Sequence, residues 1–101
     1  MWDIVVTPSS PALPWPRASA YPEQIAGKVA SPRAAAIFST AINLAGLPAL
    51  VVPAPVPEGA LPVGFQLIGQ PDAEYLLLDM AEAFERVRPW RQIAPMPAVA
   101  A

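Results

Sequence analysis

The fifteen prolines of this 101-residue chain constrain its fold more than any other feature. They fall in three stretches, Pro8 to Pro22, Pro48 to Pro62 and Pro89 to Pro97, and the segments between are nearly free of proline. Proline removes a backbone hydrogen-bond donor, so it is excluded from helix interiors and central strands. The pattern predicts short regular elements joined by stiff, extended connections, in a chain long enough for one domain or less.

Residue usage excludes several classes of function. The net charge is −2 and the six basic residues form no long stripe, so we expect no nucleic-acid partner. The chain has no cysteine and no histidine, which excludes disulfides and thiolate metal sites and removes the commonest general base. We therefore expect no metal and no cofactor.

The proportion of charged residues is low for a free-standing small domain. Charged residues make up 14% and apolar residues 54% of the chain, whereas average domains have about 25% charged residues. Such a chain has more apolar surface than it can bury alone, as expected for a piece of a larger protein.

No segment is expected to enter a membrane or a secretory pathway. The apolar stretch from Ala34 to Ala54 has the length of a membrane span, but Pro48 and Pro53 interrupt it, so a soluble helix, turn and strand is the better interpretation. The residues after Met1 lack the pattern of a signal peptide. We expect a cytoplasmic protein that does not bind membranes.

Local patterns predict three short strands, at 3–7, 49–52 and 63–68. The first is a continuous apolar run, which is typical of a central strand covered on both faces. The second and third can pair as a hairpin. With two main helices, the order is strand, long loop, helix, strand, strand, helix. This is an α/β pattern, but three short strands make a poor sheet on their own.

The first helix is expected over 33–45. Ser31 is a predicted N-cap, and Pro32 suits the first helical position. Gly46 suits the left-handed position just after the helix, and Pro48 prevents its continuation.

The second helix is expected to begin after Asp72, as its N-cap, and to end before Pro89. Trp90 is expected to fold back on it. One apolar stripe should face the core because four residues recur at helical spacing: Leu77, Met80, Ala81 and Phe84.

Several segments, in order, carry a family resemblance. They are Asp3 to Pro8, Asn43-Leu44-Ala45-Gly46-Leu47-Pro48-Ala49, Val51-Val52-Pro53, Leu61 to Gly69, Glu74 with Leu77 and Leu78, and Arg88-Pro89-Trp90. Together they resemble the C-terminal portion of the amidase signature family.

The resemblance implies a fragment of a larger α/β/α fold with a mixed sheet, in an enzyme that hydrolyses or transfers amide groups. Residues 1–101 would be the C-terminal segment of an amidase domain, with a Pro-rich loop region at 8–30 and a frayed tail at 91–101. In the family a serine nucleophile, a second serine in a cis peptide and a lysine base carry the chemistry, in an earlier part of the sequence. The resemblance therefore implies no catalytic residue in this chain.

A serine–lysine pair within the chain is the alternative. Ser9-Ser10 is a serine pair and Lys28 is the only lysine, and a desolvated lysine can activate a serine. However, the pair lies between Pro8 and Pro11, with no glycine-rich run to supply an oxyanion hole. We interpret both serines as residues that cap turns in a loop.

Two amides are candidates for lining a substrate pocket, Asn43 and Gln66. The resemblance implies this role for Asn43 because the family's equivalent helix lies along the acyl-binding cavity. The alternative for each is a structural amide, which for Asn43 means a buried group that satisfies the backbone around Gly46 and Pro48.

Three hypotheses follow for function. The first is a truncated or split amidase, inactive alone, whose partner is the N-terminal amidase portion. The second is a non-enzymatic module that docks a partner, or a second copy of itself, through its sheet edge and apolar faces. The third is a remnant without a function.

Overall fold

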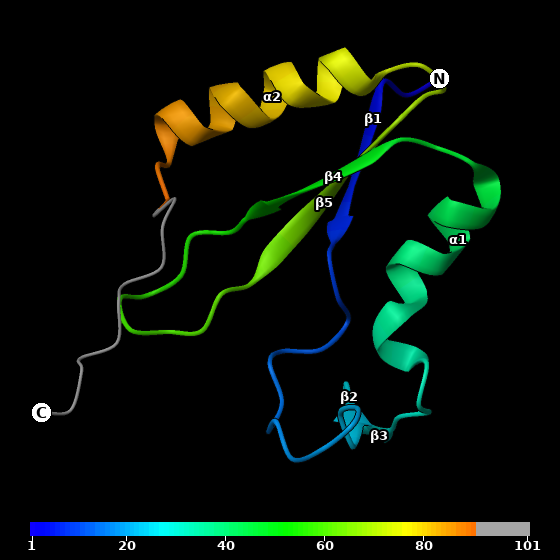
Figure 1. Ribbon diagram of the computed structural model, residues 1–101, viewed down its shortest axis with the longest axis vertical. Helices are drawn as coiled ribbons and strands as arrows, with labels where there is room; N and C mark the ends of the chain where they lie inside the picture. The colour runs from blue at the N-terminus through cyan, green and yellow to red at the C-terminus, as the bar shows by residue number, and fades with distance from the viewer. Residues whose placement is uncertain (91–101) are drawn as a thin grey trace, which may run out of the picture.

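The computed structural model describes residues 1–90 and contains a three-stranded sheet with a helix on each side (Figure 1). The sheet strands are β1 (Ile4–Pro8), β4 (Ala49–Pro53) and β5 (Gly64–Gly69). The two main helices are α1 (Ile37–Ala45) and α2 (Glu74–Val87). The α/β class, with three short strands and two main helices, is confirmed. No helix in this part of the chain is long and apolar enough to cross a bilayer.

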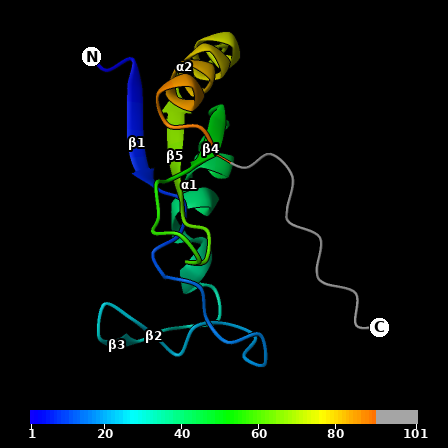
Figure 2. The same ribbon diagram turned by 90° about the vertical axis from the view of Figure 1, so that its left-hand side faces the viewer.

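The sheet has the order β1-β5-β4, with both pairs antiparallel. The predicted hairpin between β4 and β5 is confirmed. The prediction of a central first strand is wrong for this sheet: β1 lies at its edge (Figure 2), and Val6 is 60% exposed. The apolar run did not reveal which strand is central, because β1 pairs with a distant strand, from Pro8 opposite Phe65 to Ile4 opposite Gly69.

Helix α2 packs on β4 and β5, and this contact forms the core. The buried apolar side chains on this side of the sheet are Val52, Leu67 and Leu77, and Ile68 is buried on the opposite side, which Gln66 also faces. A Cβ atom at Gly69 would lie 3.0 Å from the Cβ of Ala73, so glycine permits the close approach of the chain entering α2.

An aromatic cluster closes the far end of the α2–sheet contact. The rings of Phe65 and Phe84 meet edge to face at 5.1 Å, and the ring centroid of Trp90 lies 6.2 Å from that of Phe84. The predicted return of Trp90 onto the helix is therefore confirmed. The edge-to-face geometry is one that aromatic pairs favour.

The apolar stripe predicted on α2 is confirmed at three of its four positions. Leu77 is buried, and Ala81 and Phe84 are half-buried, whereas Met80 is exposed. Met80, 39% exposed, lies at the margin of the stripe.

Both predicted N-caps are wrong. Helix α2 begins after Ala73, without a side-chain cap, because Asp72 adopts a positive φ of 67° in the turn before it. Helix α1 begins at Ile37, after a single 3₁₀ turn, η1 (Ala34–Ala36). A 3₁₀ turn has tighter hydrogen bonding than an α-helix. Here the N–H of Ala34 donates to the backbone carbonyl of Ser31 at 3.1 Å, and not to the hydroxyl of Ser31.

The predicted end of α1 is confirmed. Gly46 is left-handed, with φ of 70°, and its N–H donates to the carbonyl of Asn43 at 3.2 Å. Glycine adopts this conformation without the steric cost of a Cβ atom.

The Pro-rich region at 8–30 contains a small hairpin that the sequence did not predict. Strands β2 (Gln24–Ile25) and β3 (Lys28–Val29) pair through a turn at Ala26 and Gly27, both with positive φ. This hairpin lies below the main sheet (Figure 2). The only sequence signal was Gly27, since glycine readily adopts the positive φ of a tight hairpin turn. The frayed tail predicted at 91–101 lies outside the described residues.

Candidate functional site

Gln66 is a buried polar side chain at the centre of the sheet, only 5% exposed. Successive residues of a strand face opposite sides, so Gln66 points away from the α2 side, which Phe65 faces. Its Nε2 donates to Thr7 Oγ1 at 3.2 Å and to the carbonyl of Phe38 at 3.1 Å. One side chain thus links β5, β1 and α1. The structural interpretation of Gln66 accounts for these contacts.

Asn43 lies in the last turn of α1 and is exposed. The interpretation of its side chain as a buried amide is therefore wrong for this chain. It is the backbone carbonyl of Asn43, and not its side chain, that bonds the N–H of Gly46. Neither Asn43 nor Gln66 lines either of the two cavities described below. Their role in lining a substrate pocket stays a prediction.

Both serines of the Ser9-Ser10 pair make local structural hydrogen bonds. Ser9 Oγ donates to the carbonyl of Gly64 at 3.0 Å and so ties the end of β1 to β5. Ser10 Oγ accepts the N–H of Ala12 at 3.2 Å, as a turn-capping serine does. Lys28 is exposed on β3, in the separate hairpin. The interpretation of these serines as structural loop residues agrees with the geometry.

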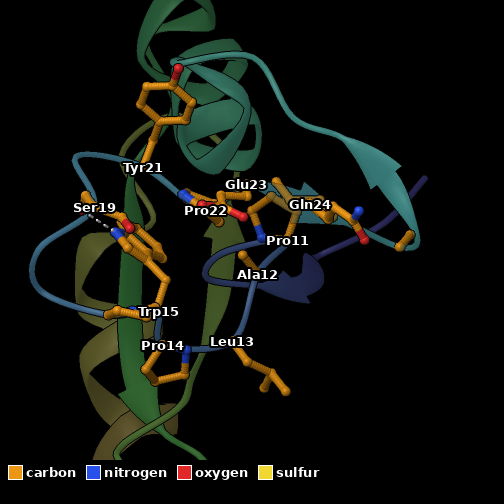
Figure 3. Close-up of a pocket in the computed structure, with 13 residues that line it drawn as sticks. Pro11, Ala12, Leu13, Pro14, Trp15, Ser19, Tyr21, Pro22, Glu23 and Gln24 are labelled. Carbon is orange, nitrogen blue, oxygen red and sulfur yellow. Dashed lines mark hydrogen bonds between the residues drawn. The ribbon is translucent and has the colours of Figure 1, made fainter.

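One cavity, of about 500 Å³, lies within the Pro-rich region (Figure 3). Its wall includes Trp15, whose indole N–H donates to the carbonyl of Ser19 at 3.2 Å and closes a short loop. Prolines and Tyr21 form much of the remaining wall, and Glu23 is the only charged lining residue. Such a wall suits a small apolar group but provides no nucleophile beside a base.

A second cavity, of about 520 Å³, lies between the β4–β5 connection and the end of α2. Pro53, Val56 and Val63 form part of its apolar wall, and Trp90 and Arg88 close it. Arg88 is its only charged lining residue. The arrangement is again that of a binding surface, with no acid–base pair.

Residues 1–90 also lack a recognisable metal centre. No group of three or more histidine, cysteine, aspartate or glutamate side chains in that part of the chain could hold an ion. The fold brings together three polar groups: the Gln66 side chain, the Thr7 hydroxyl and the backbone carbonyl of Phe38. We call this hydrogen-bonded group the Gln66 clamp, and its role is structural. Sequence reasoning did not find the two partners of Gln66, because neither is near it in the chain.

Comparison with known proteins finds relatives that match almost the whole chain. The A subunit of glutamyl-tRNA(Gln) amidotransferase from Chloroflexus aggregans is 41% identical over 96 residues, which is 92% of this chain. The protein of the same name from Thermodesulfovibrio yellowstonii is 35% identical over 97 residues, or 93% of the chain. That of Carboxydothermus hydrogenoformans is 41% identical over 93 residues, or 92% of the chain.

The matched segment covers most of this chain but only a small share of each relative's length. The chain spans about 18% of the length of these curated relatives, and it corresponds to their C-terminal portion. No protein-family model and no solved structure matches it.

Proposed function

Because this chain belongs to the amidase signature family, as the counterpart of the C-terminal portion of these relatives, we propose that it is a structural part of an amidase-type domain. We call this part the scaffold, since it is proposed to carry no catalytic residue of its own. In this proposal the amide chemistry takes place in another portion of the domain. The present residues supply part of the sheet, two helices and part of the cavity wall. The substrate class is a carbon–nitrogen amide, cleaved or transferred only when both portions are together.

The observation that carries this proposal is the extent of the similarity. Identity of 41% extends over 92% of this chain but only 18% of the relative. The described side chains are consistent with a scaffold role, because Gln66, Ser9 and Ser10 make hydrogen bonds that join elements or close turns. A scaffold without a nucleophile and base retains only a small fraction of a hydrolase's rate enhancement.

Amide turnover by the purified chain tests the proposal. We expect no release of ammonia from glutamine or from simple aliphatic and aromatic amides above the rate of a buffer blank. Hydrolysis that survives repurification and disappears on Ser10→Ala would contradict this expectation. Lys28→Met is the second variant, because a serine–lysine mechanism within the chain needs both groups.

A docking module that needs no amidase portion is the second candidate. It is favoured by the edges of the sheet, since the outer edges of β1 and β4 have no partner strand within residues 1–90. Open edges accept an added strand from another chain. A scaffold should gain stability only with the amidase portion, whereas a docking module should be a stable monomer on its own, and sedimentation with thermal melting distinguishes the two.

A further inference from the structure

Helix α1 is apolar on two faces, although only one of them contacts the rest of the described chain. Phe38 and Ile42, four residues apart, are half-buried on the inner face. Ile37, Ala41 and Leu44 recur at the spacing of a second stripe, and all three are exposed. Ile37 is 60% exposed and Leu44 is 85% exposed. A helix that is apolar around most of its circumference is typical of a buried helix.

The polar side chains of α1 are few and uncharged: Ser39, Thr40 and the exposed Asn43. No charged residue occurs anywhere from Ala34 to Pro57. The hydroxyls of Ser39 and Thr40 both donate to the carbonyl of Ala36, at 3.1 and 3.0 Å, so they are satisfied within the helix itself. Polar groups satisfied in this way can be buried at little cost.

Helix α2 provides the contrast, because its outer face carries charges. Glu74, Asp79 and Glu82 are exposed there, and Arg86 Nη2 lies 2.6 Å from Glu82 Oε1 in an exposed ion pair. The two helices lie on opposite sides of the sheet (Figure 1). The side covered by α2 therefore exposes charged side chains together with apolar ones such as Tyr75 and Leu78, whereas the exposed face of α1 carries no charge.

We propose that the α1 stripe, Ile37, Ala41 and Leu44, is the surface on which the preceding portion of an amidase-signature domain packs, and that the outer face of α2 stays in water. The inference rests on the proposed function. That portion is favoured over a second copy of this chain because the relatives devote most of their length to residues outside the matched 18%. A helix without charge, whose two hydroxyl side chains are satisfied within it, fits a permanent intradomain contact.

Cysteine labelling tests which side is covered, since the chain has no cysteine of its own. Leu44→Cys and the control Tyr75→Cys, on α2, replace large apolar residues that are 85% and 84% exposed. Each variant is made in the isolated chain and in a fusion, in which this chain replaces the matched segment of the Chloroflexus aggregans relative. Labelling by a maleimide is followed by mass spectrometry of the peptide that carries the new cysteine.

In the isolated chain both thiols should react at similar rates. In the fusion, Leu44→Cys should react at least about tenfold more slowly, while Tyr75→Cys changes less than about twofold, because thiol reactivity follows access. A soluble fusion in which both cysteines react alike would overturn the inference and leave the proposed function standing. An insoluble fusion carrying the unsubstituted chain would contradict the proposed function itself. Concentration-dependent protection of Leu44→Cys in the isolated chain would assign the stripe to a second copy and overturn the proposal.

Discussion

Gln66 joins three elements through a single side-chain nitrogen. Its Nε2 donates both to Thr7 on β1 and to the carbonyl of Phe38 on α1. The carbonyl of Phe38 belongs to the first turn of the helix, so this hydrogen bond holds α1 against the sheet. A buried amide with two partners is costly to remove, since each partner loses a hydrogen bond at a partly buried site.

Substitution of this amide should destabilise the chain far more than substitution of an exposed one. We expect Gln66→Ala to lower the free energy of unfolding by about 2 kcal/mol, from the unpaired groups and the cavity that remain. Gln70→Ala is the matched control, because Gln70 Nε2 donates to the carbonyl of Trp2 at 3.0 Å at an exposed site, and its loss should cost below about 0.5 kcal/mol. Urea denaturation of both variants measures the difference, and equal losses would contradict the clamp.

For single residues, prediction from the sequence succeeded where the backbone conformation alone determines which residue type is suitable. Gly46 was assigned correctly because few other residues adopt its left-handed conformation easily. Ser31 and Asp72 were assigned as caps from residue type alone, but a 3₁₀ turn and a positive φ gave the two helices other starts. The exposure of Asn43 was missed because it depends on what packs beside α1, which no local pattern contains.

At the scale of elements, the placement of strands and helices followed from proline, glycine and apolar spacing. The strand order did not, because the pairing of β1 with β5 is a long-range contact. Apolar spacing identified the buried face of α2 because that helix is amphipathic. It could not show which face of α1 is inner, since both faces are apolar.

The dependence of the fold on the buried face of α2 can be measured with two adjacent leucines. Leu77 is 2% exposed and lies over Gly69, where an added Cβ atom would come within 3.4 Å of it, whereas Leu78 is 55% exposed. Leu77→Ala should lower the free energy of unfolding by about 3 kcal/mol, as core leucine truncations do. Leu78→Ala should cost less than about 1 kcal/mol. Guanidinium denaturation followed by circular dichroism gives both values, and a Leu78→Ala cost as large as that of Leu77→Ala would mean that the helix faces are assigned wrongly.

At the scale of the whole molecule, the buried core is small compared with the exposed apolar surface. Four apolar residues are buried among residues 1–90, while exposed large apolar residues occur on every main element of the fold except β5. A domain of this length normally gains its stability from burying more than half of the surface of the unfolded chain. The α/β class was predictable because it needs only local patterns. The incompleteness of the core was indicated by the low charge of the sequence.

The isolated chain should therefore be marginally stable or self-associating. We expect a broad thermal transition centred below about 60 °C, or a sedimentation coefficient that rises with protein concentration, since ordinary domains melt at about 45–65 °C. Scanning calorimetry and analytical ultracentrifugation provide the two measurements. A monodisperse monomer with a sharp, cooperative transition well above that range would show that the described core is sufficient by itself.

The pairing of β1 with β5 has a consequence for the order in which the chain folds. The hydrogen bond from Gln66 to Thr7 spans 59 residues, so this ladder forms only after a long loop has closed. Loop closure of this kind carries an entropic cost and slows folding, whereas the β4–β5 hairpin needs only a local turn. During synthesis β1 leaves the ribosome before β5 has been made, so it stays unpaired until most of the chain has been synthesised. In that interval, any other polypeptide with a suitable strand can pair with the open edge of β1 and so compete with β5.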